Sequence, residues 1–89
     1  MVEKKIEIVN KLGLHARAAA VLVQEASKFD SDIQITFEDN TVNAKSILGV
    51  MMLAAMKGDT VKVKTEGEDE IEAMEAIEEL IKNRFGEKE

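Results

Sequence analysis

Apolar side chains alternate with polar ones in three segments of the chain, which is the pattern of strands with one buried face. These segments cover residues 2–8, 33–37 and 61–64. The run Glu38-Asp39-Asn40 follows the second segment and predicts a hairpin turn into a short strand over residues 41–43. Since each strand has one polar face, we expect a four-stranded sheet that is covered on one side only.

Three other segments have the composition and spacing of helices. Residues 16–28 favour a helix with an apolar stripe, and Ser46 is a good N-cap for the apolar run Ile47–Met56. Asp69 begins an amphipathic segment, and Gly86 is the expected C-cap of that helix. The apolar stripe of this last helix is predicted to contain Ile71, Met74, Ile77 and Ile81.

The predicted order of elements is therefore β-α-β-β-α-β-α. The chain has 89 residues, enough for one domain over residues 1–89 and too few for two. Four strands and three helices in so short a chain predict an α+β fold of two layers, with the helices on one face of the sheet.

Composition excludes several classes of protein. The chain has no cysteine, so disulfides and thiol chemistry are excluded, and their absence in a small domain favours the cytoplasm. It has neither an apolar run long enough to span a membrane nor a start typical of a signal peptide. A net charge of −6 argues against a nucleic-acid binder.

The charge is unevenly distributed along the chain. Residues 66–89 contain ten Asp and Glu against three Lys and Arg, so that segment carries −7. Residues 8–24 and 40–58 contain no acidic side chain, and they include Lys11, Arg17, Lys45 and Lys57. We expect any anion-binding site to be built from these two acid-free windows.

His15, the only histidine, lies at the predicted start of the first helix. The first turn of a helix has unpaired N–H groups, which together with the helix dipole attract anions. A neutral imidazole there is a nucleophile near physiological pH, and the guanidinium of Arg17 can bind a phosphoryl group through two hydrogen bonds. His15 and Arg17 are therefore candidates for phosphoryl chemistry.

Other roles for His15 are an ordinary surface position or a helix cap. A metal site has no obvious ligands, because the nearest carboxylates in sequence, Glu7 and Glu25, are eight and ten positions away. No set of residues suggests a hydrolytic triad.

The stretch Gly13-Leu14-His15-Ala16-Arg17 resembles the active-site signature of HPr, the phosphocarrier of the bacterial phosphoenolpyruvate-dependent phosphotransferase system. Residues 42–51, with the sequence VNAKSILGVM, match a second block of that family. Residues 21–24 and 26–29 also resemble family sequence, and the order of strands and helices agrees throughout. The resemblance implies an open-faced sandwich with three helices on a four-stranded antiparallel sheet.

The resemblance also implies roles for individual residues. His15 would accept a phosphoryl group on Nδ1 from the phosphohistidine of Enzyme I and donate it to a IIA component, and Ala16 and Arg17 would form the phosphoryl cradle. Ser46 matches a regulatory site that an ATP-dependent kinase phosphorylates, and a transcriptional regulator is a further implied partner. Such a protein is a carrier without a cofactor and not a turnover enzyme, and we expect a monomer.

One residue departs from the family pattern. Family members usually have proline directly after the active-site arginine, where this chain has Ala18. Proline suits the first turn of a helix, but alanine is also a good helix former. We expect an altered but working site.

The run Ile47–Met56 is too apolar for a helix that is buried on one face only. Some of its side chains must face solvent, and methionine adapts to several partners. The predicted docking patch beside His15 consists of Ile47, Leu48, Met51 and Met52.

Two alternatives belong to other functional classes. A non-transport HPr-like regulator would act by protein–protein interaction through Ser46, although the intact His15-Ala16-Arg17 stretch argues against a silent histidine. An RNA-binding module would need exposed aromatic and basic residues on its sheet, and the chain has three Phe and no Tyr or Trp.

Overall fold

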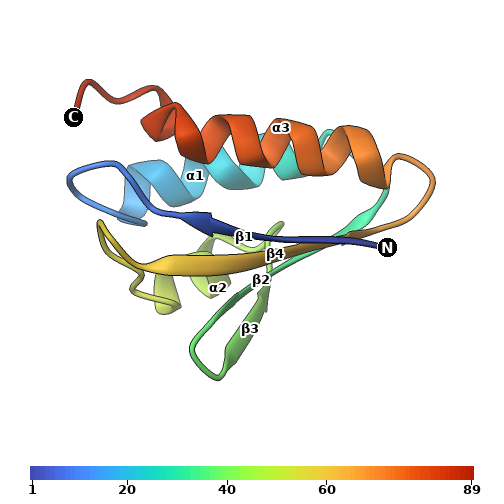
Figure 1. Ribbon diagram of the computed structural model, residues 1–89, viewed down its shortest axis with the longest axis horizontal. Helices are drawn as coiled ribbons and strands as arrows, with labels where there is room; N and C mark the ends of the chain where they lie inside the picture. Colours follow the sequence, from blue (N-terminus) through green and yellow to red (C-terminus); the bar gives the residue numbers. More distant parts are fainter.

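A computed structural model describes all residues from 1 to 89, and it contains one layer of strands and a layer of helices (Figure 1). The strands are β1 (Val2–Glu7), β2 (Asp32–Phe37), β3 (Asn40–Asn43) and β4 (Thr60–Glu66). The helices are α1 (Ala16–Ala26), α2 (Ile47–Met52) and α3 (Glu70–Lys82), followed by a tight turn over Arg84–Gly86. The predicted order β-α-β-β-α-β-α is confirmed.

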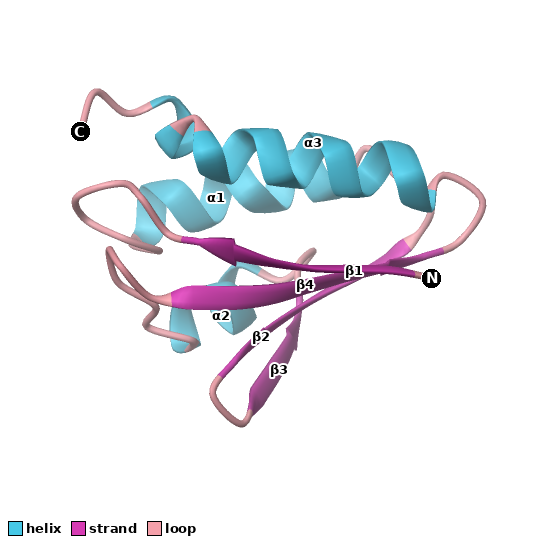
Figure 2. Cartoon of the chain, in the orientation of Figure 1, coloured by secondary structure: helices cyan, strands magenta, loops and turns pink.

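The four strands form one antiparallel sheet in the order β1-β4-β2-β3. Neighbouring strands place apolar residues opposite one another, with Ile6 across from Val61 and Val63 across from Ile35. These side chains are buried, whereas the alternate residue Lys62 is exposed. Helices α1 and α3 lie side by side on one face of the sheet, as Figure 2 shows, which confirms the open-faced α+β sandwich.

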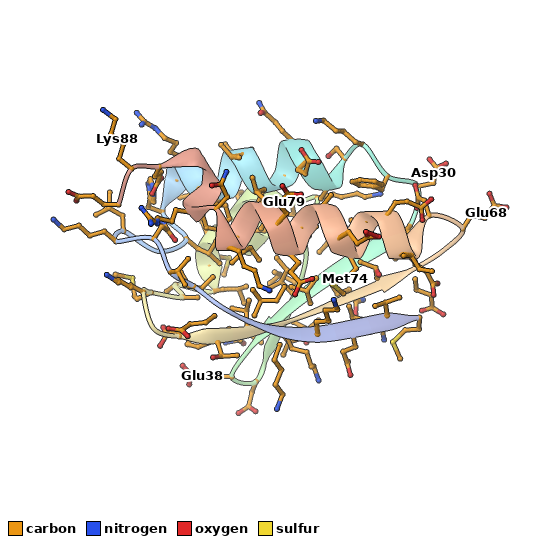
Figure 3. All side chains as sticks on the ribbon, turned by 45° about the horizontal axis from the view of Figure 1, so that its top comes forward. Asp30, Glu38, Glu68, Met74, Glu79 and Lys88 are labelled. Atoms are coloured by element: carbon orange, nitrogen blue, oxygen red, sulfur yellow. The ribbon has the colours of Figure 1, made fainter.

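One cluster of buried apolar side chains joins the two layers. Ile6, Ile33, Ile35, Val61 and Val63 come from the sheet and meet α1 and α3. Met74 of α3 points down from its helix toward the strands (Figure 3). No helix combines the length and the apolar character that crossing a membrane requires.

The predicted phase of α3 was wrong at one residue. Met74, Ile77 and Ile81 are buried as expected, but Ile71 is 61% exposed and Ala73 is buried. At about 100° per residue, position 71 lies roughly a quarter turn from the centre of the stripe that the other three define. Ala73 lies at the opposite edge of this stripe and is buried there.

The predicted ends of the helices also need correction. The first helix ends at Ala26 instead of Lys28, and α3 ends at Lys82, before the tight turn that contains Gly86. The second helix ends at Met52 instead of Met56, because Ala54 adopts a φ of 55°. Beyond this point Leu53 and Ala55 turn inward and are buried, so the apolar run continues into the core without remaining helical.

Candidate functional site

His15 occupies the N-cap position of α1, with an extended backbone at φ −76° and ψ 179°. Its carbonyl oxygen accepts the first helical hydrogen bond, from Ala19 at 2.9 Å, but its side chain does not cap the helix. The N–H groups of Ala16, Arg17 and Ala18 therefore donate no hydrogen bond within the protein. Three free donors and the positive end of the helix dipole lie directly beside the imidazole.

The turn before His15 is held against the segment that follows α2. Gly13 has a φ of 66°, and a Cβ atom there would lie 2.6 Å from the carbonyl oxygen of Ala55. The next residue, Leu14, donates its N–H to that same oxygen at 2.9 Å. Only glycine allows this approach, which fixes the position of His15 relative to the end of α2.

Glu87 is the one acidic partner of His15. Its Oε2 lies 2.5 Å from His15 Nε2, and the two side chains are 15% and 28% exposed. Burial favours a raised pKa for Glu87, but hydrogen bonds from Asn10 and His15 and the charges of His15 and Arg17 outweigh it, so the pKa is lowered. Glu87 is therefore ionised at neutral pH and accepts a hydrogen bond from the ring.

The C-terminal tail reaches His15 because several contacts tie it to the loop between β1 and α1. Figure 1 shows the end of the chain beside this loop, and the Lys11 N–H donates to a main-chain oxygen of Glu89 at 2.9 Å. The Lys11 ammonium also lies 3.3 Å from the Glu89 carboxylate. The carbonyl oxygen of Lys88, the labelled tail residue in Figure 3, accepts a hydrogen bond from Arg84 at 2.7 Å.

An open groove of about 790 Å³ runs between the tail and the start of α1. Arg17 lines it and is exposed, and its side chain forms no ion pair or hydrogen bond, since the acidic partner of His15, Glu87, bonds to His15 and Asn10. Its guanidinium is thus free to bind an anion next to His15. The other lining residues are Lys11, Leu12, His15, Ala16, Glu87, Lys88 and Glu89.

Ser46 is the N-cap of α2 as the sequence predicts. Its Oγ accepts the N–H of Gly49 at 3.1 Å, and the residue is exposed. A Cβ at Gly49 would lie 3.2 Å from this oxygen and 3.3 Å from Val42, so the missing side chain leaves room for the cap.

The exposed side of α2 is apolar. Leu48 and Met52 are 73% and 79% exposed, and Ile47 and Met51 are also exposed. Met56, in the segment that packs against Gly13, is exposed as well. These side chains and the exposed Leu12 form an apolar surface next to the groove, and we call Ile47, Leu48, Met51 and Met52 the α2 patch.

Glu87 was not among the residues predicted from the sequence, because it lies 72 positions from His15 along the chain. The anion site was expected to be built from the two acid-free windows, whereas the tail brings Glu87 and Glu89 into it. Gly86 marked the end of the last helix in the sequence, but the buried Phe85 and the turn that directs Glu87 toward His15 have no local sequence signal.

The chain is similar to known proteins over its whole length. Residues 2–83 match the family model described as the PTS HPr component phosphorylation site. The phosphocarrier protein HPr of Neisseria meningitidis is 53% identical over 89 residues and is covered completely, as is this chain. A crystal structure of HPr from Thermoanaerobacter tengcongensis has 52% identity and a TM-score of 0.95, with all of both chains covered. The HPr-like protein Crh of Halalkalibacterium halodurans is 54% identical over 77 residues, which are 86% of this chain and 92% of that protein.

Proposed function

This chain belongs to the HPr family of phosphocarrier proteins, and we propose that it accepts a phosphoryl group on His15 from Enzyme I and passes it to IIA components. The observation that carries the proposal is the placement of His15 at the N-cap of α1, beside three unpaired N–H groups. A phosphoryl group on the ring would accept hydrogen bonds from Ala16 and Arg17. The bound group is then held by charge and geometry without a metal or a cofactor.

Relatives such as HPr of Neisseria meningitidis are named phosphocarrier proteins. Carrier chemistry needs a phosphoryl group that is easily gained and easily lost. The groove at His15 is open, which supports direct transfer between His15 and the reacting group of another protein. We expect the protein to work in this way in the cytoplasm and as a monomer.

The α2 patch supports docking of Enzyme I and the IIA components beside His15. The contact between Gly13 and Ala55 places the end of α2 against the active-site turn. An exposed apolar surface of leucine and methionine adjacent to a reactive residue is typical of a protein that binds several partners. We propose that partners contact Leu48 and Met52 while their reacting group enters the groove.

The exposed position of Ser46 at the start of α2 supports regulation of docking at the α2 patch. It is exposed, and a phosphate on its Oγ would add about −1.5 to −2 charge at the start of α2. We propose that an ATP-dependent kinase modifies Ser46 and that the modification weakens docking of Enzyme I. A transcriptional regulator that reads the modified surface is a further partner.

The similarity to Crh favours a second candidate function, a regulator that acts by protein–protein interaction through Ser46. The two functions differ in whether a phosphoryl group on His15 moves onward. The discriminating experiment loads the protein with labelled phosphate from phosphoenolpyruvate and Enzyme I, removes Enzyme I, and adds a IIA protein. Transfer of the label to the IIA protein supports the carrier, whereas label that never leaves this chain supports the regulator.

A further inference from the structure

A chain of hydrogen bonds connects His15 to the backbone of its own turn. Gly13 O accepts a hydrogen bond from Asn10 Nδ2 at 2.8 Å, and the same nitrogen donates to Glu87 Oε1 at 2.9 Å. The other carboxylate oxygen, Oε2, lies 2.5 Å from His15 Nε2.

The chemistry of the groups fixes which of them donates and which accepts in each of these hydrogen bonds. A carbonyl oxygen can only accept, so Asn10 must present its NH₂ group to Gly13. An ionised carboxylate can also only accept, so His15 must present Nε2 as an N–H. We infer that Glu87 is a positioning residue: together with Asn10 and Gly13 it holds His15 in the tautomer protonated on Nε2, so that Nδ1 keeps a free electron pair for the phosphoryl group.

The burial of Asn10 prevents the donors and acceptors of these hydrogen bonds from exchanging roles. Asn10 is fully buried, and its Oδ1 has no hydrogen-bond partner. Turning the amide over would place Oδ1 against two other acceptors, Gly13 O and the Glu87 carboxylate, and would gain no bond. The amide therefore has one favourable orientation, and that orientation demands an acceptor at position 87.

This inference rests on the proposed function, because it explains which nitrogen of His15 can react. During transfer, the Nδ1 electron pair forms the new N–P bond, the N–P bond of the Enzyme I phosphohistidine breaks, and that electron pair returns to the Enzyme I nitrogen. The proton on Nε2 stays in place, so the ring becomes positively charged as the bond forms. The Glu87 carboxylate beside Nε2 stabilises that charge. Nδ1 itself makes no hydrogen bond within the protein.

Glu87→Gln is a sharp test because it keeps the shape of the side chain and changes its polarity. Asn10 still requires an acceptor, so the glutamine turns its oxygen to Asn10 and its NH₂ group to His15. Nε2 must then accept, and the proton moves to Nδ1. We expect ¹⁵N shifts of the neutral imidazole to show mainly the Nε2–H form in the wild type and mainly the Nδ1–H form in Glu87→Gln. The rate of phosphoryl acceptance should fall about tenfold to a hundredfold, as when other residues that orient a histidine are replaced.

Glu75→Gln is the matched control, since Glu75 is exposed on α3, forms no side-chain hydrogen bond or ion pair, and does not line the groove. It should leave the tautomer and the acceptance rate unchanged. Glu87→Ala offers neither donor nor acceptor, so its tautomer ratio should lie between those of the wild type and Glu87→Gln. Unchanged Nε2–H predominance in folded Glu87→Gln would overturn the inference, as would a wild type that is mainly Nδ1–H. The tautomer is measured without Enzyme I, so this result does not depend on phosphoryl transfer. The proposed function is contradicted by a different result, a wild type that takes up no phosphate from Enzyme I.

Discussion

His15 Nε2 lies 2.5 Å from Glu87 Oε2, although 72 positions separate these residues in the chain. The contact places the nucleophile of the active-site turn and a carboxylate of the C-terminal tail in one site. His15 therefore has two different neighbours, a carboxylate and a set of N–H groups. Glu87 contacts Nε2, and the free N–H groups at the start of α1 provide an anion cradle beside the ring.

The free N–H of Ala18 leads to a prediction about the residue that departs from the family pattern. Ala18→Pro should be tolerated, because the Ala18 N–H donates no hydrogen bond that proline would remove. A stiffer unfolded chain should stabilise the variant by about 0.4–1 kcal/mol. For a domain of this size the gain corresponds to a rise in Tm of about 2–8 °C, measurable by thermal melts.

Phosphoryl acceptance should be little affected in Ala18→Pro, since Ala16 and Arg17 keep their N–H groups. A clear drop in Tm would contradict the prediction. It would mean that the proline ring does not fit at this fully buried position.

Ser46→Asp should slow phosphorylation of His15 without unfolding the protein. Aspartate is also a good N-cap, so the bond to Gly49 can be kept and Tm should hardly change. The added charge should instead weaken docking of Enzyme I, by about fivefold at low salt if it is worth about 1 kcal/mol at the rim of the interface. The loss should shrink as salt screens the charge, which transfer kinetics at two ionic strengths would reveal.

Ser46→Ala is the control, because it removes the capping oxygen without adding charge. It should lower stability by about 1 kcal/mol and leave the salt dependence of transfer as in the wild type. Equal transfer rates for Ser46→Asp and the wild type at low salt would remove the electrostatic explanation.

Asp69 gives a prediction about acid stability. Asp69 was predicted to begin α3 and is its N-cap residue, but its side chain does not cap that helix. It accepts hydrogen bonds from the Ser31 hydroxyl and from the N–H groups of Asp30 and Ser31. The Ser31 hydroxyl is the main cause of the lowered pKa of Asp69.

A carboxyl whose pKa is lowered on folding stabilises the fold above its unfolded pKa, and this stabilisation is lost as the pH falls through the folded pKa. Asp69→Asn should therefore lower Tm at pH 7, and its Tm should approach that of the wild type below about pH 4, the usual range of the group. Glu68→Gln, an exposed neighbour without a hydrogen bond, is the control and should leave Tm unchanged at both pH values. A Tm difference for Asp69→Asn that is the same at pH 7 and pH 3 would contradict this account.

The sequence could predict those features that depend on local periodicity. Strand alternation placed Ile6, Val61 and Val63 correctly, because the strand period of two leaves no choice of face once one side is apolar. The helix period is less decisive, as the exposed Ile71 shows. An apolar side chain at the edge of a helical stripe is buried only if another element extends far enough to cover it.

The site could be predicted only where its residues are neighbours in the chain. His15, Arg17 and Ser46 take their positions from the helices that they begin or enter, and helix starts have recognisable sequence signals. Glu87 has no such signal, since its place depends on a turn over Arg84–Gly86 with positive φ at all three residues. The length of α2 was overpredicted for a similar reason: Ala54 has a positive φ, which nothing in an apolar run announces.

The most direct test of the account is to locate the phosphoryl group that Enzyme I and phosphoenolpyruvate transfer to this chain. Intact-mass measurement should show one phosphoryl group per molecule, acid-labile as expected for phosphohistidine, and tandem mass spectrometry should place it on His15. The matched His15→Ala variant should fold normally and take up none. Labelling of His15→Ala at the wild-type rate, or a wild type that stays unmodified with active Enzyme I, would contradict the claim that His15 is the phosphoacceptor.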